Sequence, residues 1–211
     1  MIIRRTLTNA FLKAVLTMLC RIDDSGLKDV PLEGPVIICI NHINFLDAPL
    51  MQIVLHPRSV RGFAKKETWD TPFLKFLFNT FDAIPVDREK VDLKAFREVV
   101  KTMEEKRFLC MAPEGTRSGT GVLQKGRPGI VTLALKTGAP VLPLAHAGTE
   151  KFWSNFKRLR RTPITLRAGR PIYLESPGKA DSKKREEMTD LIMHELAALL
   201  PPEMRGPYTK G

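Results

Sequence analysis

Short apolar runs alternate with helical patterns along most of this chain. Val36–Ile40 is rich in β-branched residues and follows Gly34-Pro35, so it predicts a buried strand. Phe108–Met111 and residues 141–145 have a similar character. Because parallel strands need crossover connections, alternating strands and helices favour a largely parallel sheet. The sequence therefore predicts an α/β fold with a largely parallel central sheet flanked by helices and an N-terminal amphipathic helix.

Further elements complete this predicted pattern. Helices are expected at residues 44–55, 71–81, 91–106, 127–136 and 188–199, and strands at residues 59–64, 83–86, 164–166 and 172–174. We expect residues 1–22 to form the amphipathic helix and residues 23–211 to form a single catalytic domain, entered through a polar linker at residues 23–35. The expected helix at residues 71–81 is apolar almost all round, which fits either a fully buried helix or the wall of an acyl-chain tunnel.

A histidine and an aspartate follow the first predicted buried strand. His42 lies in the predicted turn and Asp47 lies in the first turn of the next helix, five residues later. A chain that folds back here would let the carboxylate accept a hydrogen bond from one imidazole nitrogen. The other nitrogen would then be free to accept a proton, as in the base of a hydrolase triad. The alternative is that His42 caps the helix and Asp47 interacts with the helix dipole.

A second polar loop, Pro113-Glu114-Gly115-Thr116-Arg117, follows the strand Phe108–Met111. Strands that run parallel end at the same edge of a sheet, so the two loops are expected to form one site. Two further blocks lie at residues 84–88 (Ile-Pro-Val-Asp-Arg) and 141–144 (Val-Leu-Pro-Leu).

These four blocks, in this order, resemble the glycerolipid acyltransferase family with the His-x4-Asp motif, over roughly residues 35–150. The chain departs from the residues that are frequent in the family at Asn44, Asp82 and Ala112. The resemblance implies acyl transfer from acyl-CoA or acyl carrier protein to the hydroxyl of a lysophospholipid, with 1-acylglycerol-3-phosphate as the foremost acceptor, in phospholipid biosynthesis. Another lysolipid or a lipid-linked acceptor is the alternative.

The resemblance also implies roles for individual residues. His42 and Asp47 would be catalytic, and the substrate-binding residues would be Arg88, Glu114, Gly115, Thr116 and Arg117. The arginines can bind an acceptor phosphate through charge-assisted hydrogen bonds, or they can form structural ion pairs with Asp87 or Glu114. Backbone N–H groups at Gly115-Thr116 and at the start of the helix after His42 are candidate donors to the phosphate and to the oxyanion. No cofactor and no metal are expected.

Charge and cysteine content indicate the setting. The 211 residues include 34 Lys+Arg against 23 Asp+Glu, a formal net charge of +11, which favours an anionic partner. Cys39 and Cys110 lie in apolar runs, so buried thiols in a reducing compartment are expected, although Cys39 could also serve as a nucleophile.

Two segments predict contact with a membrane. Residues 3–21 carry an apolar stripe between basic residues and are too short and too charged to span a bilayer. The stripe consists of Ile3, Leu7, Ala10, Phe11, Ala14, Val15 and Met18. The alternative is a helix that packs its stripe on the protein's own core. Residues 151–161 interleave cations with aromatic residues, which suits an anionic membrane surface; nucleic acid and a solvated basic helix are alternatives. A peripheral, monotopic enzyme on the cytoplasmic face of the cell membrane is expected, with no nucleic acid partner.

Two other classes of function remain open. A non-enzymatic basic protein would bind a membrane or nucleic acid through residues 151–161. A hydrolase would use the His42–Asp47 pair on water, but the chain has no G-x-S-x-G elbow. The glycines at residues 121–126 have the spacing of a phosphate-binding loop, but Arg127-Pro128 replaces its Lys-Ser/Thr pair.

Overall fold

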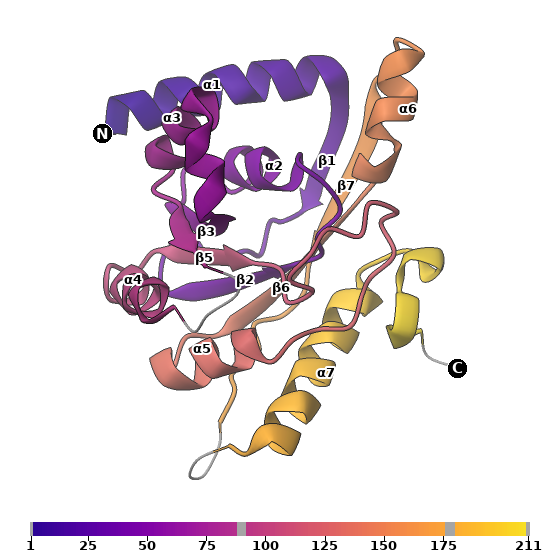
Figure 1. Cartoon of the computed structure of the whole chain (residues 1–211). Coiled ribbons are helices and arrows are strands. Elements are labelled where there is room, and N and C mark those ends of the chain that lie inside the picture. The colour runs from indigo at the N-terminus through magenta and orange to yellow at the C-terminus, as the bar shows by residue number, and fades with distance from the viewer. Residues whose placement is uncertain (1, 88–91, 176–179, 210–211) are drawn as a thin grey trace.

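The computed structural model describes residues 2–87, 92–175 and 180–209. Within these ranges one sheet has the strand order β1-β7-β6-β2-β5-β3-β4 (Figure 1). The strands are β1 (Cys20–Gly26), β2 (Val36–Ile40), β3 (Val60–Lys65), β4 (Ile84–Val86), β5 (Phe108–Met111), β6 (Val141–Ala147) and β7 (Thr162–Ala168). The helices are α1 (Ile2–Leu19), α2 (Asp47–Val54), α3 (Pro72–Thr80), α4 (Leu93–Glu104), α5 (Gly129–Thr137), α6 (Phe152–Lys157) and α7 (Ser182–Ala198).

All neighbouring strands pair in parallel except β6 and β7, which are antiparallel. The predicted α/β fold with a largely parallel sheet is therefore confirmed. The carboxyl ends of β2, β5 and β6 meet at one edge, because β2 pairs in register with β5 on one side and β6 on the other. This edge is where the sequence places His42 and the Glu114 loop.

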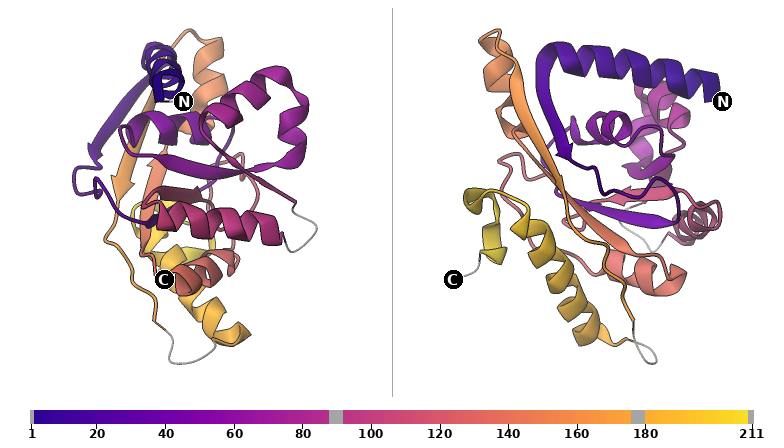
Figure 2. Two further views of the ribbon diagram at one scale, coloured as in Figure 1. Left: turned by 90° about the vertical axis from the view of Figure 1, so that its left-hand side faces the viewer. Right: turned by 180° about the vertical axis from the view of Figure 1, so that it is seen from behind.

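Helices cover both faces of the sheet, and the strand β2 contributes to both cores. Ile37 and Cys39 point into a cluster formed with α4, α5 and α7, whereas Val36, Ile38 and Ile40 point into a cluster formed with α1 and α2. Figures 1 and 2 show the two layers, with α1, α2 and α3 on one side and α4, α5 and α7 on the other. A strand buried on both faces has no polar side, which explains why its sequence is uniformly apolar.

Several boundaries differ from the predictions. The linker expected at residues 23–35 is wrong for residues 23–26, which form part of β1 and pair with β7. Of the strand expected at residues 172–174, only a single bridge between Ile172 and Val141 forms. The helix after His42 begins at Asp47 rather than Asn44, because Asn44 and its neighbours form a turn held by hydrogen bonds to side chains.

The predicted apolar stripe of α1 faces outward. Leu7 and Phe11 have exposed fractions of 65% and 64%, and Ile3 and Met18 are also exposed, while Leu16 on the opposite face is buried. The alternative in which this stripe packs on the protein's own core is therefore wrong. Helix α3 is also not fully buried, since Phe73 and Phe76 are exposed.

No helix in the described ranges has both the length and the apolar character needed to cross a bilayer.

Candidate active site

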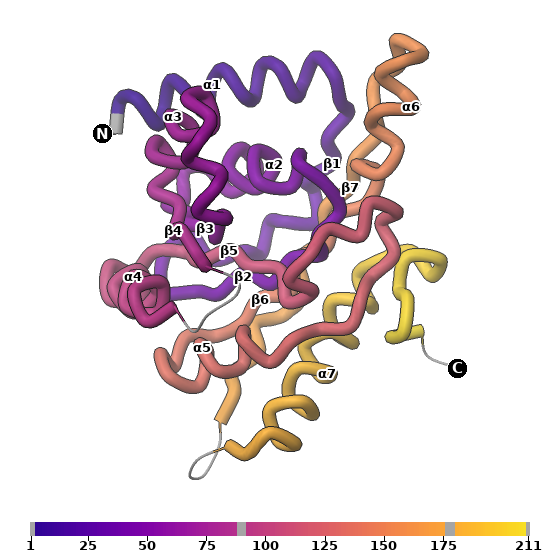
Figure 3. Tube along the Cα trace, in the orientation of Figure 1, coloured from indigo at the N-terminus to yellow at the C-terminus, as the bar shows by residue number. Residues whose placement is uncertain are grey.

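Three strand ends bring the polar residues of the site together. His42 directly follows Asn41 at the end of β2, Glu114 lies in the loop after β5, and His146 lies near the end of β6. The tube in Figure 3 shows these three strand ends converging between the helical layers. Residues that are about 30 to 105 positions apart in the sequence thus become neighbours because their strands share one register.

His42 and Asp47 form the predicted pair. The imidazole Nδ1 of His42 lies 2.7 Å from Oδ2 of Asp47, and the same oxygen accepts hydrogen bonds from the backbone N–H groups of Ile43 at 2.8 Å and Asn44 at 3.1 Å. A carboxylate that receives these donors acts as an acceptor, so Nδ1 of His42 must carry the proton. The Nε2 atom is then left as the acceptor on a side chain that is 21% exposed. This is the tautomer that a general base requires.

The turn that carries His42 is bonded on several sides. The Asn44 side chain accepts from the N–H of Leu46 at 2.9 Å and donates to the carbonyl of Thr149 at 2.8 Å. The N–H of Asp47 donates to the carbonyl of Asn44 at 3.4 Å. The N–H groups of Asn44, Leu46 and Asp47 are therefore occupied, and the prediction that the start of this helix supplies oxyanion donors is wrong for these three groups.

Glu114 supports the turn rather than pointing outward. It is 2% exposed, and its two carboxylate oxygens accept the N–H of His42 at 2.6 Å and the N–H of Gln124 at 2.9 Å. Burial raises the pKa of the Glu114 carboxyl, while the hydrogen bonds from His42 and Gln124 and the charge of His42 act in the opposite direction. The carboxylate thereby ties the loop after β5 to the backbone of His42.

The rest of the Glu114 loop is more open. Thr116 and Arg117 are exposed. Among the described residues Arg117 forms no ion pair, so neither Asp87 nor Glu114 is its ion-pair partner. The N–H of Gly115 donates to the carbonyl of Ala112 at 3.2 Å, and the substrate-binding role of Gly115 stays a prediction. Arg88 lies outside the described residues.

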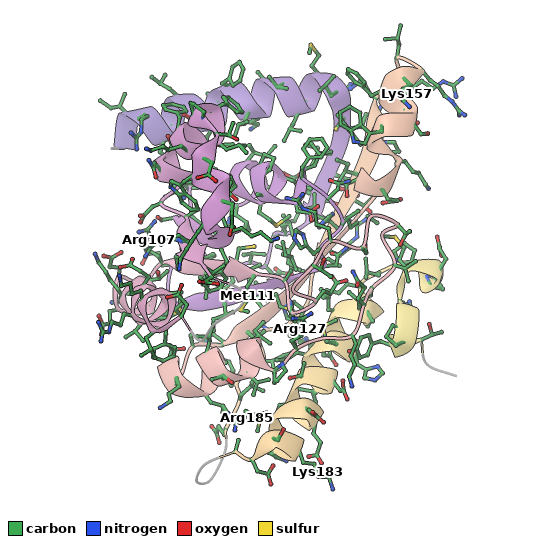
Figure 4. All side chains as sticks on the ribbon, viewed as in Figure 1. Arg107, Met111, Arg127, Lys157, Lys183 and Arg185 are labelled. Carbon is green, nitrogen blue, oxygen red and sulfur yellow. The ribbon has the colours of Figure 1, made fainter. Side chains whose placement is uncertain are left out.

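A cleft of about 400 Å³ opens beside this loop. It is lined by Glu114, Thr116, Gln124, Lys125, Gly126, Arg127, Pro128 and Glu186. Lys125 and Arg127 place two cations at its wall, and Figure 4 shows Arg127 between the loop and the start of α5. This segment includes the glycines at residues 121–126, which have the spacing of a phosphate-binding loop but are not followed by its lysine.

The buried cysteines do not supply a nucleophile. Cys39 lies in the centre of the sheet, and its burial raises its pKa well above the ordinary value. Burial likewise raises the pKa of Cys110 to about 12. A thiol held neutral is a poor nucleophile, so the alternative role considered for Cys39 is not supported. Within the described residues, no three His, Cys, Asp or Glu side chains are arranged to hold a metal ion.

An aromatic cluster links the site to the apolar surface. The ring of Phe45, which lies between His42 and Asp47 in the chain, is 5.8 Å from Phe152 and 5.5 Å from Trp153 of α6. Phe45 and Trp153 remain partly exposed. The turn that carries His42 is thus in contact with the basic and aromatic segment at residues 151–161.

A histidine held by an aspartate at the carboxyl edge of a mostly parallel sheet is an arrangement that suits proton abstraction from a hydroxyl group. The chain belongs to the Acyltransferase family, whose model matches residues 21–147. Both catalytic candidates and the Glu114 loop lie inside the matched range. The family predicted from the four sequence blocks is therefore confirmed.

Three relatives place the chain within this family. A 1-acyl-sn-glycerol-3-phosphate acyltransferase of Limnanthes alba is 36% identical over 136 residues, which are 63% of this chain and 48% of that protein. The protein of the same name from Cocos nucifera is 30% identical over 183 residues, 83% of this chain and 57% of that protein. The one from Bacillus subtilis is 24% identical over 189 residues, 89% of this chain and 92% of that protein. The chain thus spans about half the length of the two plant relatives.

The fold also has a solved counterpart. The crystal structure of the 1-acyl-sn-glycerophosphate acyltransferase from Thermotoga maritima superposes with a TM-score of 0.71 and 20% sequence identity. The match covers 92% of this chain and 78% of that one. It confirms the arrangement of sheet and helices.

Sequence reasoning missed His146. It lies one residue beyond the predicted strand at residues 141–145, is buried, and has its Nε2 atom 3.5 Å from Oδ1 of Asp47. A signal was present, because a histidine at the carboxyl end of a parallel strand lies at the same edge as His42. Only the strand order β6-β2-β5, however, shows that these two ends are adjacent.

Proposed function

We propose that this chain transfers a fatty acyl group from a thioester, acyl-CoA or acyl carrier protein, to the hydroxyl of a lysophospholipid, with 1-acylglycerol-3-phosphate as the acceptor. The observation that carries the proposal is the 2.7 Å contact between His42 and Asp47, which leaves Nε2 of an accessible imidazole as a proton acceptor. The names of the relatives from Limnanthes alba, Cocos nucifera and Bacillus subtilis support this choice of acceptor.

The reaction follows from the geometry of the pair. Nε2 of His42 removes the proton of the acceptor hydroxyl as that oxygen bonds to the thioester carbonyl carbon. The tetrahedral intermediate then collapses, the carbon–sulfur bond breaks, and the thiolate leaves with the electron pair. The imidazolium returns its proton to the thiolate. Asp47 stabilises the transient positive charge of the imidazolium, and no covalent acyl-enzyme is required.

The acceptor phosphate would be bound by cations of the Glu114 loop and the neighbouring cleft. Arg117 is exposed and has no ion-pair partner among the described residues, so its guanidinium is available for a bidentate contact. Lys125 and Arg127 at the cleft wall add positive potential. Arg88 is proposed for the same role from its sequence block alone. Glu114 is proposed to act by positioning His42, and Gly115 and Thr116 by shaping the loop.

The enzyme is proposed to work at the cytoplasmic face of the cell membrane as a peripheral, monotopic protein. The support is the outward apolar face of α1, the exposed phenylalanines of α3 and the basic and aromatic segment at residues 151–161. The aromatic contacts of Phe45 with α6 support a position of the His42 turn close to the membrane. An acceptor dissolved in a bilayer could thus reach His42 without entering water.

The proposal is tested with purified protein, acyl-CoA and lysophosphatidic acid by following free thiol and lipid product together. Equal amounts of thiol and acylated lipid are expected. Thiol without new lipid would indicate a hydrolase, and neither product would favour a non-enzymatic binding protein. Both results contradict the proposal.

The catalytic assignment predicts the effect of two substitutions. His42→Ala should lower kcat about 10²- to 10⁴-fold, which is the usual contribution of a general base. Asp47→Asn should also lose most activity, because an amide in place of the carboxylate no longer selects the Nδ1–H tautomer of His42. His56→Ala is the matched control, since His56 is exposed at the end of α2. A His42→Ala protein with the turnover of the wild type would refute the assignment.

A further inference from the structure

A second histidine contacts the catalytic aspartate from the opposite side. The Nε2 atom of His146 lies 3.2 Å from the carbonyl oxygen of Asn41 and 3.5 Å from Oδ1 of Asp47. Both neighbours are hydrogen-bond acceptors. Nε2 of His146 must therefore carry a proton, which it donates to the carbonyl of Asn41, with Oδ1 of Asp47 3.5 Å away.

The other ring nitrogen has a complementary neighbour. Nδ1 of His146 lies 3.5 Å from the hydroxyl oxygen of Thr149, which can donate its proton to a neutral imidazole. Burial, and to a smaller extent the charge of His42, lowers the pKa of His146. The charges of Asp47 and Glu150 and the hydrogen bond with Asn41 act in the opposite direction. The net direction favours the neutral ring, so one tautomer of His146 satisfies Asn41, Asp47 and Thr149 together.

The backbone holds this ring in place. The Asn41 side chain donates to the carbonyl of His146 at 2.9 Å and accepts the N–H of His146 at 3.0 Å. This double contact joins the residue before His42 to the strand end that carries His146. The side chain of His146 is fully buried and has no room to serve as a proton acceptor for a substrate.

We propose that His146 is a positioning residue for the transfer reaction. Its Nε2–H attracts Oδ1 of Asp47, which also accepts the N–H of Asn44 at 3.2 Å, and so helps to keep Oδ2 against Nδ1–H of His42. The proposal rests on the proposed function for its kinetic consequence. Its structural consequence, the tautomer of His42, holds whether or not the acceptor has been correctly chosen.

Two substitutions of His146 distinguish the effect of its N–H donor from the effect of its side-chain volume. His146→Leu fills the space without an N–H, whereas His146→Gln can place an amide N–H near the position of Nε2. His146→Leu should lower kcat about 10- to 100-fold, the loss expected for a hydrogen bond to a charged group, and leave the acceptor KM within about twofold. His146→Gln should recover most of the loss. His194→Leu is the matched control, because His194 is exposed on α7 and contacts Tyr208.

A readout independent of activity follows from the small number of histidines. The chain contains four, so ¹⁵N-labelled histidine gives an NMR spectrum in which each ring can be assigned by substitution. The wild type and His146→Gln should show His42 with the proton on Nδ1. In His146→Leu a mixture of tautomers is expected at His42, and a role confined to folding stability would not produce this change.

His146→Phe provides a second variant in case His146→Leu does not fold, because it keeps a planar ring and removes both ring nitrogens. It should change kcat and the His42 tautomer in the same direction as His146→Leu. The proposal is overturned if the His42 tautomer is unchanged in folded His146→Leu, or if His146→Gln is no better than His146→Leu. When His146→Leu is unfolded, an unchanged His42 tautomer in folded His146→Phe overturns it. Absence of acyl transfer in the wild type would instead count against the proposed function, because the tautomers remain measurable.

Discussion

Two buried carboxylates hold the turn that carries His42, and they do so through different atoms. Asp47 accepts from the imidazole and from two backbone N–H groups, whereas Glu114 accepts the N–H of His42 itself. Placing carboxylates in a buried position is costly unless their oxygens are satisfied, and here backbone donors satisfy them. The position of His42 is thus fixed by hydrogen bonds to Asp47 of α2 and to Glu114 in the loop after β5.

Substitution of the single side chain of Arg117 tests the proposed phosphate site. Arg117→Ala should raise the KM for lysophosphatidic acid about 10- to 100-fold, because a charge-assisted contact contributes about 1.5–3 kcal/mol. The KM for the thioester should stay within about twofold. Steady-state kinetics with each substrate varied in turn measure both constants. Arg170→Ala, another exposed arginine, serves as the control, and an unchanged acceptor KM in Arg117→Ala would show that Arg117 does not bind phosphate.

One face of helix α1 packs on the protein, and the opposite face is exposed. Leu16 packs into the core with α2, and Arg5 donates to Ser59 at 2.9 Å, to Val60 at 3.1 Å and to Gln52 at 3.2 Å. Arg161 donates to the carbonyls of Thr17 and Cys20, so this arginine anchors α1 rather than facing a membrane. Deleting the helix would remove core residues, and point substitutions are the sharper test of its outer face.

The double substitution Leu7→Asp with Phe11→Asp should weaken binding to lipid vesicles without changing Tm by more than a few degrees. Both side chains are exposed, so their loss removes apolar area available to a membrane and leaves the core intact. Vesicle flotation and thermal unfolding measure the two effects. The control is Leu191→Asp, which changes a half-exposed leucine on α7, on the other side of the sheet. Unchanged flotation of the double variant would show that α1 does not contact lipid.

At the scale of the whole molecule, the exposed apolar residues of α1 and α3 lie at the same end as the basic and aromatic helix α6. Figure 1 shows α1, α3 and α6 along the same end of the molecule, and Figure 4 shows Lys157 near the tip of α6. Lys183 and Arg185 lie at the start of α7, at the opposite end (Figure 4). Cations thus lie at both ends, but those of α6 lie beside the exposed apolar residues of α1 and α3. This predicts that binding to anionic vesicles is oriented and that salt weakens it.

The substitution of Lys157, Arg158 and Arg160 by Gln should lower the affinity for anionic vesicles by about 3 kcal/mol at low salt, since each cation near the surface contributes about 1 kcal/mol. The three side chains are exposed. The matched control replaces Lys183, Lys184 and Arg185 by Gln, which makes the same change in net charge at the opposite end. Flotation over a range of salt concentrations compares the two. Equal losses would indicate that only net charge matters and that the proposed face is wrong.

The sequence by itself determined the elements and the pair at the centre of the site. Val36–Ile40 could be recognised as a buried strand because short runs of apolar β-branched residues favour buried strands. His42 and Asp47 are only five residues apart, so a single turn can bring their side chains into contact. The sequence could not show whether the apolar stripe of α1 faces the core or the solvent, because the same periodicity serves either surface. It also could not show that His146 reaches Asp47.

Tertiary structure decided these points because they depend on which strands are neighbours. The order β6-β2-β5 brings His146 and Glu114 to the two sides of the His42 turn from more than 70 residues away in the chain. The pairing of β1 with β7 converts residues 23–26 of the expected linker into part of an edge strand directly after α1. The spacing of residues along the chain does not predict such pairings, because they arise from hydrogen bonds and burial between segments that are distant in sequence.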